Sequence, residues 1–348
     1  MRWENLSAPP DEEHPDGAAP ATPPLPLALP GAVARTFDTP GFAGMTFYEI
    51  RAKSIINRVP GTSRVPFEWT INPYRGCSHA CVYCFARNTH TYLDLDAGAD
   101  FDRKVIVKVN AGELVRRELA APRWRGAPVA MGTNVDCYQR AEGRYRLMPP
   151  IIEALRDFAN PFSILTKGTL ILRDLPLLRQ AAEVTRVSPS FSVGFVDEAL
   201  WRSVEPGTPS PRRRLDAVRA LTDAGFAVGV LMAPILPGLS DTDESVEATV
   251  AAIAAAGAAS VTPLALHLRP GAREWYAHWL ARAHPRLVAR YRELYRAGAY
   301  APQAYQRELT ARVRIAARRH GLLRGERSDD RQPPETPAPP AAEQLSLL

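Results

Sequence analysis

Three cysteines close together are the part of the sequence best suited to chemistry. Cys77, Cys81 and Cys84 lie in the stretch INPYRGCSHACVYCFARNTH with the spacing C-x3-C-x2-C. Thiolates are the usual protein ligands of iron–sulfur clusters, and three of them on one loop leave the fourth iron of a 4Fe–4S cubane without a protein ligand. A substrate or cofactor can bind to such an open iron. The motif therefore predicts a cluster that takes part in chemistry.

Two other interpretations of these cysteines stay open at this point. The thiols could bind zinc, with His79, His90 or Cys137 completing the site, or they could be unrelated buried residues. Structural zinc sites usually show two separated pairs of ligands, and the sequence has no second pair of this kind. The spacing favours the cluster.

Composition narrows the class of protein. Four cysteines in 348 residues are too few for a disulfide scaffold, so we expect a reducing compartment, the cytoplasm. We expect neither export nor membrane insertion, because the N-terminus lacks a basic segment followed by an apolar one and no stretch has the ~20 apolar residues that span a bilayer. The net charge of +6 favours polyanionic partners only mildly.

The predicted elements place the cysteines in an α/β domain. Short β-branched runs alternate with helical stretches, which is typical of a parallel sheet or barrel. Asp241 with Glu244 has the spacing of a helix N-cap. Seven runs are predicted to be strands: 67–71, 105–109, 129–133, 163–166, 190–193, 227–234 and 260–266.

Four segments are expected along the chain. Residues 1–45 are predicted to be mostly disordered and 326–348 to be a flexible Pro-rich tail, because neither has enough apolar residues to offset the entropy of ordering. Between them we predict a core barrel at 46–270 and a helical region at 271–325. The arginines of the helical region interleave with tyrosines, which suits nucleic-acid binding, although packing against the barrel explains the tyrosines better.

The cysteine loop after the first strand, with an aromatic residue before the last cysteine, resembles the radical S-adenosylmethionine superfamily. The segments SILTKG, SFSVG, EPGTPSPRRRLDAVRALTDAGFAVGVLMAPI and MGTNVDCYQRAEGRYRL are similar to the spore photoproduct lyase and DNA repair photolyase-like branch, over about residues 67–268. The resemblance implies a partial (βα)6 TIM-type barrel with the cluster at the carboxyl ends of the strands. Seven strands are one too many, so we interpret 105–109 as an insertion. The resemblance also implies that S-adenosylmethionine binds the open iron and yields a 5′-deoxyadenosyl radical.

Carried over position by position, the resemblance implies several cofactor-binding residues. Lys167 would bind the carboxylate of S-adenosylmethionine, and Ser192 would bind the ribose. Tyr83 would lie near the adenine, and Ala233 would offer its backbone to it.

Two positions depart from spore photoproduct lyase. In that enzyme a cysteine on the second barrel strand donates a hydrogen atom, and a tyrosine after the last cluster cysteine helps to relay it. Here Thr133 and Phe85 stand at these positions, and neither side chain can do this chemistry. We retain Thr133 as a candidate cofactor-binding residue and Cys137 as a tentative hydrogen-atom donor.

The last residues, EQLSLL, resemble the peptide by which bacterial DNA polymerases and repair proteins bind the sliding clamp. Gln344, Leu345, Leu347 and Leu348 would enter a groove on the clamp from the tip of a flexible spacer. The alternative is an apolar tail that docks on its own domain.

Together these features predict a radical S-adenosylmethionine enzyme, lyase-like or transferase-like, that acts on a nucleic acid or nucleotide. An electron donor such as flavodoxin or ferredoxin would reduce the cluster. One alternative is a radical enzyme that modifies a peptide or small metabolite, and a second is a non-catalytic iron–sulfur or zinc sensor.

Overall fold

The protein is described from a computed structural model, which places residue 29 and residues 31–60 and 65–322. Most of the predicted N-terminal disordered segment, the Pro-rich tail and the clamp-binding peptide lie outside these residues. None of the helices that the model describes is long and apolar enough to cross a membrane.

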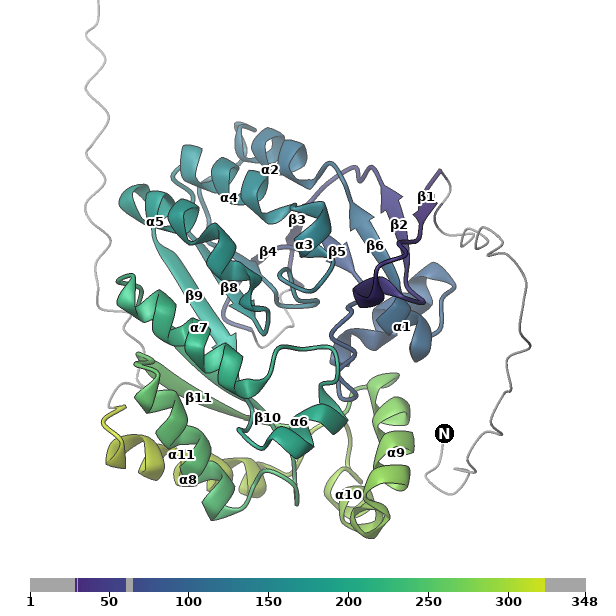
Figure 1. Cartoon of the computed structure of the whole chain (residues 1–348), viewed down its shortest axis with the longest axis vertical. Helices are drawn as coiled ribbons and strands as arrows, with labels where there is room; N and C mark the ends of the chain where they lie inside the picture. Colours follow the sequence, from purple (N-terminus) through teal and green to yellow (C-terminus); the bar gives the residue numbers. More distant parts are fainter. Residues whose placement is uncertain (1–28, 30, 61–64, 323–348) are drawn as a thin grey trace, which may run out of the picture.

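A seven-stranded sheet forms the centre of the described part of the chain, in the order β11-β10-β9-β8-β7-β4-β3 (Figure 1). Neighbouring strands are parallel except that β3 is antiparallel to β4. The predicted (βα)6 arrangement is confirmed as a partial barrel, since no pairing within the described residues joins β11 to β4 or β3. The strands are β3 Ile56–Arg58, β4 Trp69–Ile71, β7 Val129–Met131, β8 Phe162–Thr166, β9 Val187–Ser192, β10 Gly229–Ile235 and β11 Ser260–Ala265.

A second, four-stranded sheet lies beside the barrel, in the order β1-β2-β6-β5. Its strands are β1 Val33–Arg35, β2 Thr46–Ile50, β5 Tyr74–Arg75 and β6 Lys104–Lys108. The predicted strand at 105–109 is therefore confirmed as an insertion outside the barrel. β1 lies within the range predicted to be mostly disordered, where it pairs antiparallel with β2.

Helices α2, α4, α5, α7 and α8 form an arc outside the barrel strands (Figure 1). Their bounds are α2 Ala111–Leu119, α4 Met148–Asp157, α5 Leu175–Val184, α7 Pro211–Asp223 and α8 Asp243–Ala255. Shorter elements lie in the connections: η2 Pro40–Phe42, η3 Phe85–Leu93, α1 Ala99–Arg103, α3 Glu142–Tyr145, η4 Thr169–Asp174 and α6 Glu198–Val204. The N-cap of α8 is Thr242, whose hydroxyl accepts from the Ser245 amide, so the predicted cap at Asp241 is wrong by one residue.

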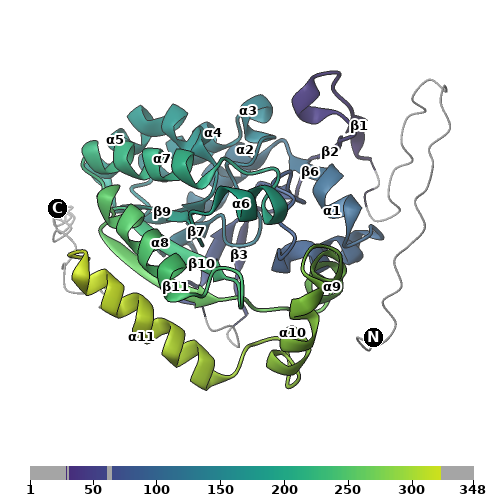
Figure 2. The same cartoon turned by 60° about the horizontal axis from the view of Figure 1, so that its bottom comes forward.

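The C-terminal region is helical, as predicted. It comprises α9 Ala272–Ala283, η5 Pro285–Leu287, α10 Val288–Leu294 and α11 Gln303–Arg319. Figure 2 shows the chain passing from α10 to α11, which packs against α8 and β11.

Packing accounts for most of the tyrosines of this region. Tyr291 and Tyr295 are fully buried, in one apolar cluster with Tyr83 and Cys81 of the cysteine loop. The Tyr295 hydroxyl donates to the Leu266 carbonyl at 2.7 Å. The helical region thus packs directly on the loop that carries the cysteines.

The ends of β7 and β8 approach so closely that a glycine is required between them. Gly132 and Gly126 both have a positive φ, +75° and +71°, so an alanine at either position incurs about 1–2 kcal/mol of strain. At Gly132 a Cβ would also lie 1.8 Å from the Leu165 carbonyl oxygen, whereas nothing lies within 4 Å at Gly126.

We therefore expect Gly132→Ala to lower the free energy of unfolding by ~1–3 kcal/mol more than Gly126→Ala, because overpacking adds to the strain. Urea unfolding of the two variants measures the difference. Equal losses would contradict the close approach of the two strands.

Candidate functional site

A cavity of about 180 Å³ lies where the cysteine loop meets the carboxyl ends of β7, β8, β9, β10 and β11. Cys77, Cys81 and Cys84 line it from the loop. The sequence-predicted residues at the strand ends line it as well: Tyr83, Thr133, Lys167, Ser192 and Ala233. Eight of the nine predicted site residues are thus brought together, in the place where barrel enzymes carry their chemistry.

A buried arginine holds the cysteine loop in place. Arg87 is fully buried, and its guanidinium donates to the carbonyl oxygens of Cys81 at 3.0 Å and Gly98 at 2.8 Å. It also donates to both carboxylate oxygens of Asp102, at 2.8 and 2.9 Å. The Arg87 side chain lies over the ring of Trp275 on α9, at 4.7 Å from its centroid. One cation therefore ties the cysteine loop to the insertion and to the C-terminal helices.

Further backbone contacts hold the first half of the loop. The Gln139 amide group donates to the Gly76 carbonyl and accepts from the Ser78 amide, both at 2.9 Å. On the other side, the Gly207 amide donates to the His79 carbonyl at 3.1 Å. A Cβ at Gly207 would lie 2.1 Å from the Ser78 carbonyl oxygen, so the two loops pack without side chains between them.

The three thiols have the chemistry that a cluster requires. Burial raises the pKa of Cys77 well above its usual value and that of Cys81 to about 12, although the Lys167 ammonium lowers the latter. Burial also raises the pKa of Cys84, and the positive charge of Arg87 partly offsets this rise. Two buried thiols and one half-buried thiol at one cavity need nearby positive charge to become thiolates, and the irons of a cluster would supply it. The residues present therefore fit a 4Fe–4S cluster.

The zinc alternative finds less support in the same geometry. His79 and His90 do not line the cavity, and the ring of His90 bonds the Lys104 carbonyl at 2.8 Å.

A buried network connects Tyr83 to the strand ends. Glu205 is fully buried and accepts from the Tyr83 hydroxyl and from the Arg214 guanidinium. Arg214 also donates to the Ser192 carbonyl at 2.9 Å, and the Ser192 hydroxyl donates to the Ala233 carbonyl at 2.7 Å. Burial alone would raise the pKa of Glu205, but Arg214 and then Lys167 outweigh it and hold the pKa below its usual value. Glu205 is therefore a carboxylate that aligns the predicted cofactor residues.

A second carboxylate, which was not predicted, positions Lys167. Asp136 lines the cavity and accepts from the Lys167 amide and the Thr166 hydroxyl, both at 2.6 Å. His79 lies 3.4 Å from it, and burial lowers the pKa of this imidazole to about 4. Both carboxylate oxygens of Asp136 therefore accept hydrogen bonds from the end of β8 and hold it in place.

Cys137 is the predicted site residue that does not line the cavity. It is fully buried in the main apolar core, where burial raises its pKa well above the usual value. A hydrogen-atom donor must reach the substrate, and this geometry gives the proposed role no support.

Several residues of the site were not found in the sequence. Arg87, Asp102 and Gln139 act on the loop backbone from distant parts of the chain, and their spacing follows no ligand pattern. His267 lines the cavity beyond the end of β11. The only available signal was its position after a predicted strand of the barrel.

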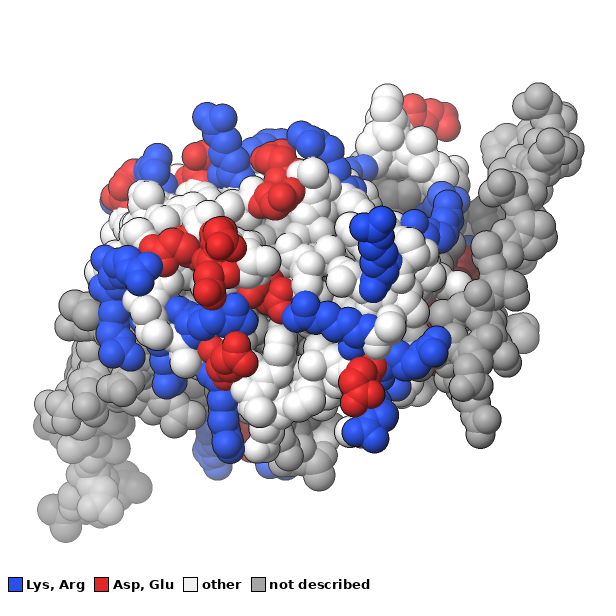
Figure 3. Space-filling view, turned by 90° about the horizontal axis from the view of Figure 1, so that it is seen from below, with Lys and Arg blue, Asp and Glu red and all other residues white. Residues whose placement is uncertain are grey.

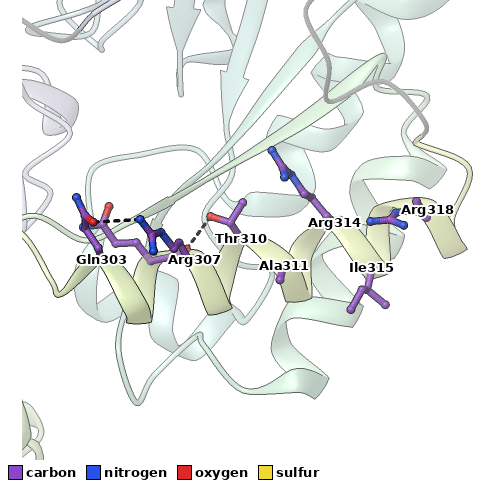
Figure 4. Close-up of a pocket in the computed structure, with 8 residues that line it drawn as sticks. Gln303, Arg307, Thr310, Ala311, Arg314, Ile315 and Arg318 are labelled. Carbon is purple, nitrogen blue, oxygen red and sulfur yellow. Dashed lines mark hydrogen bonds between the residues drawn. The ribbon is translucent and has the colours of Figure 1, made fainter.

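A larger hollow, of about 600 Å³, lies along α11 (Figure 4). All eight residues that line it belong to this one helix, among them Arg307, Arg314 and Arg318. It contains no thiol or carboxylate and none of the predicted site residues. We therefore assign the candidate site to the cysteine cavity.

Comparisons with known proteins show which family and which folds the chain is similar to. Residues 71–252 match the family model of the radical SAM superfamily. An uncharacterized protein of Mycobacterium tuberculosis is 49% identical over 325 residues, 92% of this chain and 95% of that protein. An uncharacterized protein of Methanocaldococcus jannaschii is 28% identical over 197 residues, 56% of this chain and 70% of that protein.

Among solved structures, a spore photoproduct lyase variant with bound AdoMet and dinucleoside spore photoproduct has a TM-score of 0.59 and 16% sequence identity. The similarity covers 78% of each chain. At this identity the likeness concerns the fold.

Loss of the buried ion pair of Arg87 should cost more free energy of unfolding than loss of an ion pair on the surface. Arg87→Met leaves the Asp102 carboxylate, only 14% exposed, without its cation, which typically costs ~3–5 kcal/mol. Arg116→Met removes an exposed pair with Asp157 and should cost no more than ~1 kcal/mol.

Thermal unfolding and the iron bound per chain after anaerobic reconstitution measure both variants. We expect Arg87→Met to lower the melting temperature and the iron content, and Arg116→Met to leave the iron content unchanged. Full iron content in a destabilised Arg87→Met protein would show that the cysteine loop does not depend on this cation.

Proposed function

Because the chain belongs to the radical S-adenosylmethionine superfamily and is an enzyme of that superfamily, we propose that it uses a 4Fe–4S cluster bound by Cys77, Cys81 and Cys84. The observation that carries this proposal is that the three thiols line one cavity with the ends of five barrel strands. The cluster and S-adenosylmethionine would supply a 5′-deoxyadenosyl radical. The chain itself would bind these groups, orient them and exclude water. Membership of an enzyme superfamily favours this over the sensor alternative.

The positions of the cavity residues support the proposed binding of S-adenosylmethionine. The ammonium of Lys167 lies 5.8 Å from the centroid of the Tyr83 ring. It forms no ion pair with the residues that the structure describes, so it can pair with the carboxylate of the methionine group. Ser192 and Ala233 present a hydroxyl and a carbonyl that bond each other at 2.7 Å, and both suit a ribose or adenine. Thr133 offers a further hydroxyl at the end of β7.

We propose a nucleic acid or nucleotide as the substrate. The fold resembles that of spore photoproduct lyase, for which a structure with a dinucleoside photoproduct is known. Figure 3 shows basic and acidic side chains interspersed on the face seen from below, so that face does not resemble an extended duplex-binding surface. We therefore propose a short or single-stranded substrate, which needs no extended basic face.

The proposal predicts that anaerobic wild-type protein cleaves S-adenosylmethionine to 5′-deoxyadenosine under reduction, and that an oligonucleotide stimulates the cleavage. Chromatography of the product measures both effects. Cys81→Ala should lose the visible absorbance of the cluster and all cleavage, because the remaining two thiols cannot hold three irons.

Cys137→Ala is the matched control, since this cysteine does not line the cavity. We expect it to keep the cluster absorbance. Retained absorbance in Cys81→Ala would refute the ligand assignment, whereas stimulation by a peptide instead of an oligonucleotide would favour the peptide alternative. Flavodoxin or ferredoxin is the electron donor we propose for the cell.

We also propose that the C-terminal peptide binds the DNA sliding clamp. Gln344, Leu345, Leu347 and Leu348 have the required pattern, and they follow a Pro-rich spacer that allows an extended tether. A clamp-bound enzyme would be delivered to DNA.

Calorimetry with a peptide that ends in EQLSLL tests the clamp proposal. We expect saturable binding to the purified clamp, weakened at least about tenfold when Gln344 and Leu347 are both replaced by alanine, since ~1.4 kcal/mol is lost with the groove contacts. Heat signals that are equal for the two peptides, or absent for both, would exclude the interaction.

A further inference from the structure

A stack of rings connects the cysteine cavity to solvent. Phe85, directly after the last cluster cysteine, and His267, beyond β11, both line the cavity, with ring centroids 5.5 Å apart. The His267 ring also stacks on Tyr300, with the ring centroids 5.6 Å apart and an interplanar angle of 23°. The guanidinium of Arg269 lies 5.4 Å from the Phe85 centroid and donates to the Tyr300 hydroxyl at 3.2 Å.

Tyr300 differs from the other tyrosines of the helical region. It is 56% exposed, whereas Tyr291 and Tyr295 are fully buried. The loop between α10 and α11 carries it, and a β-bridge between Tyr300 and His267 fixes this loop, next to a hydrogen bond from the Leu268 amide to the Ala299 carbonyl at 2.7 Å. The C-terminal region thus holds an exposed aromatic ring against His267, a residue that lines the cavity, and we call this place the mouth of the cavity.

The charged group beside Tyr300 and His267 is a cation, Arg269. Burial, and then the Arg269 charge, lowers the pKa of His267 to about 4, so the imidazole is neutral near neutral pH. Arg269 is exposed and has no carboxylate within salt-bridge distance among the residues that the structure describes. Its single bond to Tyr300 leaves most of its five N–H donors available. The mouth therefore offers an open ring face beside an unpaired cation.

We propose that Tyr300 and Arg269 form a substrate platform, on which one nucleobase stacks against the open face of Tyr300 while its phosphate pairs with Arg269. The inference rests on the proposed nucleic-acid substrate. Stacking on an aromatic side chain suits every base, and guanidinium groups pair with phosphate through two parallel hydrogen bonds. An aromatic peptide would use the ring but would leave the cation without an anion.

Fluorescence anisotropy of reconstituted, S-adenosylmethionine-loaded protein with a labelled oligothymidylate of about ten nucleotides, near the size of such sites, tests the platform. Tyr300→Ala should weaken binding about 5- to 150-fold, the range that ~1–3 kcal/mol per stacked base corresponds to. Tyr300→Phe should bind within about threefold of wild type, because it keeps the ring. Arg269→Gln should reduce the salt dependence, lowering the slope of log K against log salt by about 0.7.

Tyr92→Ala and Arg292→Gln are the matched controls. Tyr92 is 74% exposed and Arg292 is exposed on α10, and neither lines the cavity. Both should bind the oligonucleotide like wild type. If Tyr300→Ala binds as its control does while wild type binds well, the platform is wrong and the proposed function stands.

A failure of the proposed function would look different. Wild-type protein that binds no oligonucleotide would overturn the nucleic-acid substrate and the platform together. Binding of a tryptophan-containing peptide that is lost in Tyr300→Ala, without any oligonucleotide binding, would reassign the platform to a peptide. Thermal unfolding of each variant identifies any loss of binding that comes from misfolding.

Discussion

The rest of the site depends on the burial of one cation, Arg87, beneath the cysteine loop. A fully buried guanidinium is costly unless its donors are paired. Here its two terminal nitrogens donate to the Cys81 and Gly98 carbonyls and to the Asp102 carboxylate, whereas Nε has no partner among the described residues. These partners come from the loop and from the insertion that precedes α2. The position of the loop is thereby coupled to a part of the chain that does not belong to the barrel at all.

Much of the barrel could be predicted because most of its strands contain short runs of β-branched and other apolar residues. Parallel strands covered by helices leave this pattern in the sequence, and all seven predicted runs form strands. The resemblance then placed Lys167 and Ser192 at strand ends, where the structure has them beside the cavity. Glycine also marks the ends of two helices in the sequence: Gly225 and Gly257 follow α7 and α8, and both have a positive φ.

The parts that could not be predicted depend on contacts between distant residues. Strands β1, β3 and β5 have only two or three residues each and lie at sheet edges. Unlike the equally short β4 and β7, they therefore carry no run of buried apolar residues that a sequence could show. Asp241 was predicted to cap α8 but instead accepts from Tyr305 and Arg290, which pack on it from the C-terminal region. Glu205 and Arg214 are nine positions apart, and only the fold brings them to Tyr83 and Ser192.

The barrel and the C-terminal region contribute different residues to the proposed site, and this difference follows from their packing. The strand ends and the cysteine loop supply the proposed cluster and cofactor contacts, whereas Tyr300 comes from outside the barrel. Tyr291 and Tyr295 anchor that outer segment in the same apolar cluster as Cys81 and Tyr83. A segment held this firmly can place an exposed ring accurately at the cavity mouth. The exposed side chains of this segment do not pack in the core. They can therefore be replaced to suit a different substrate without disturbing the cysteine loop.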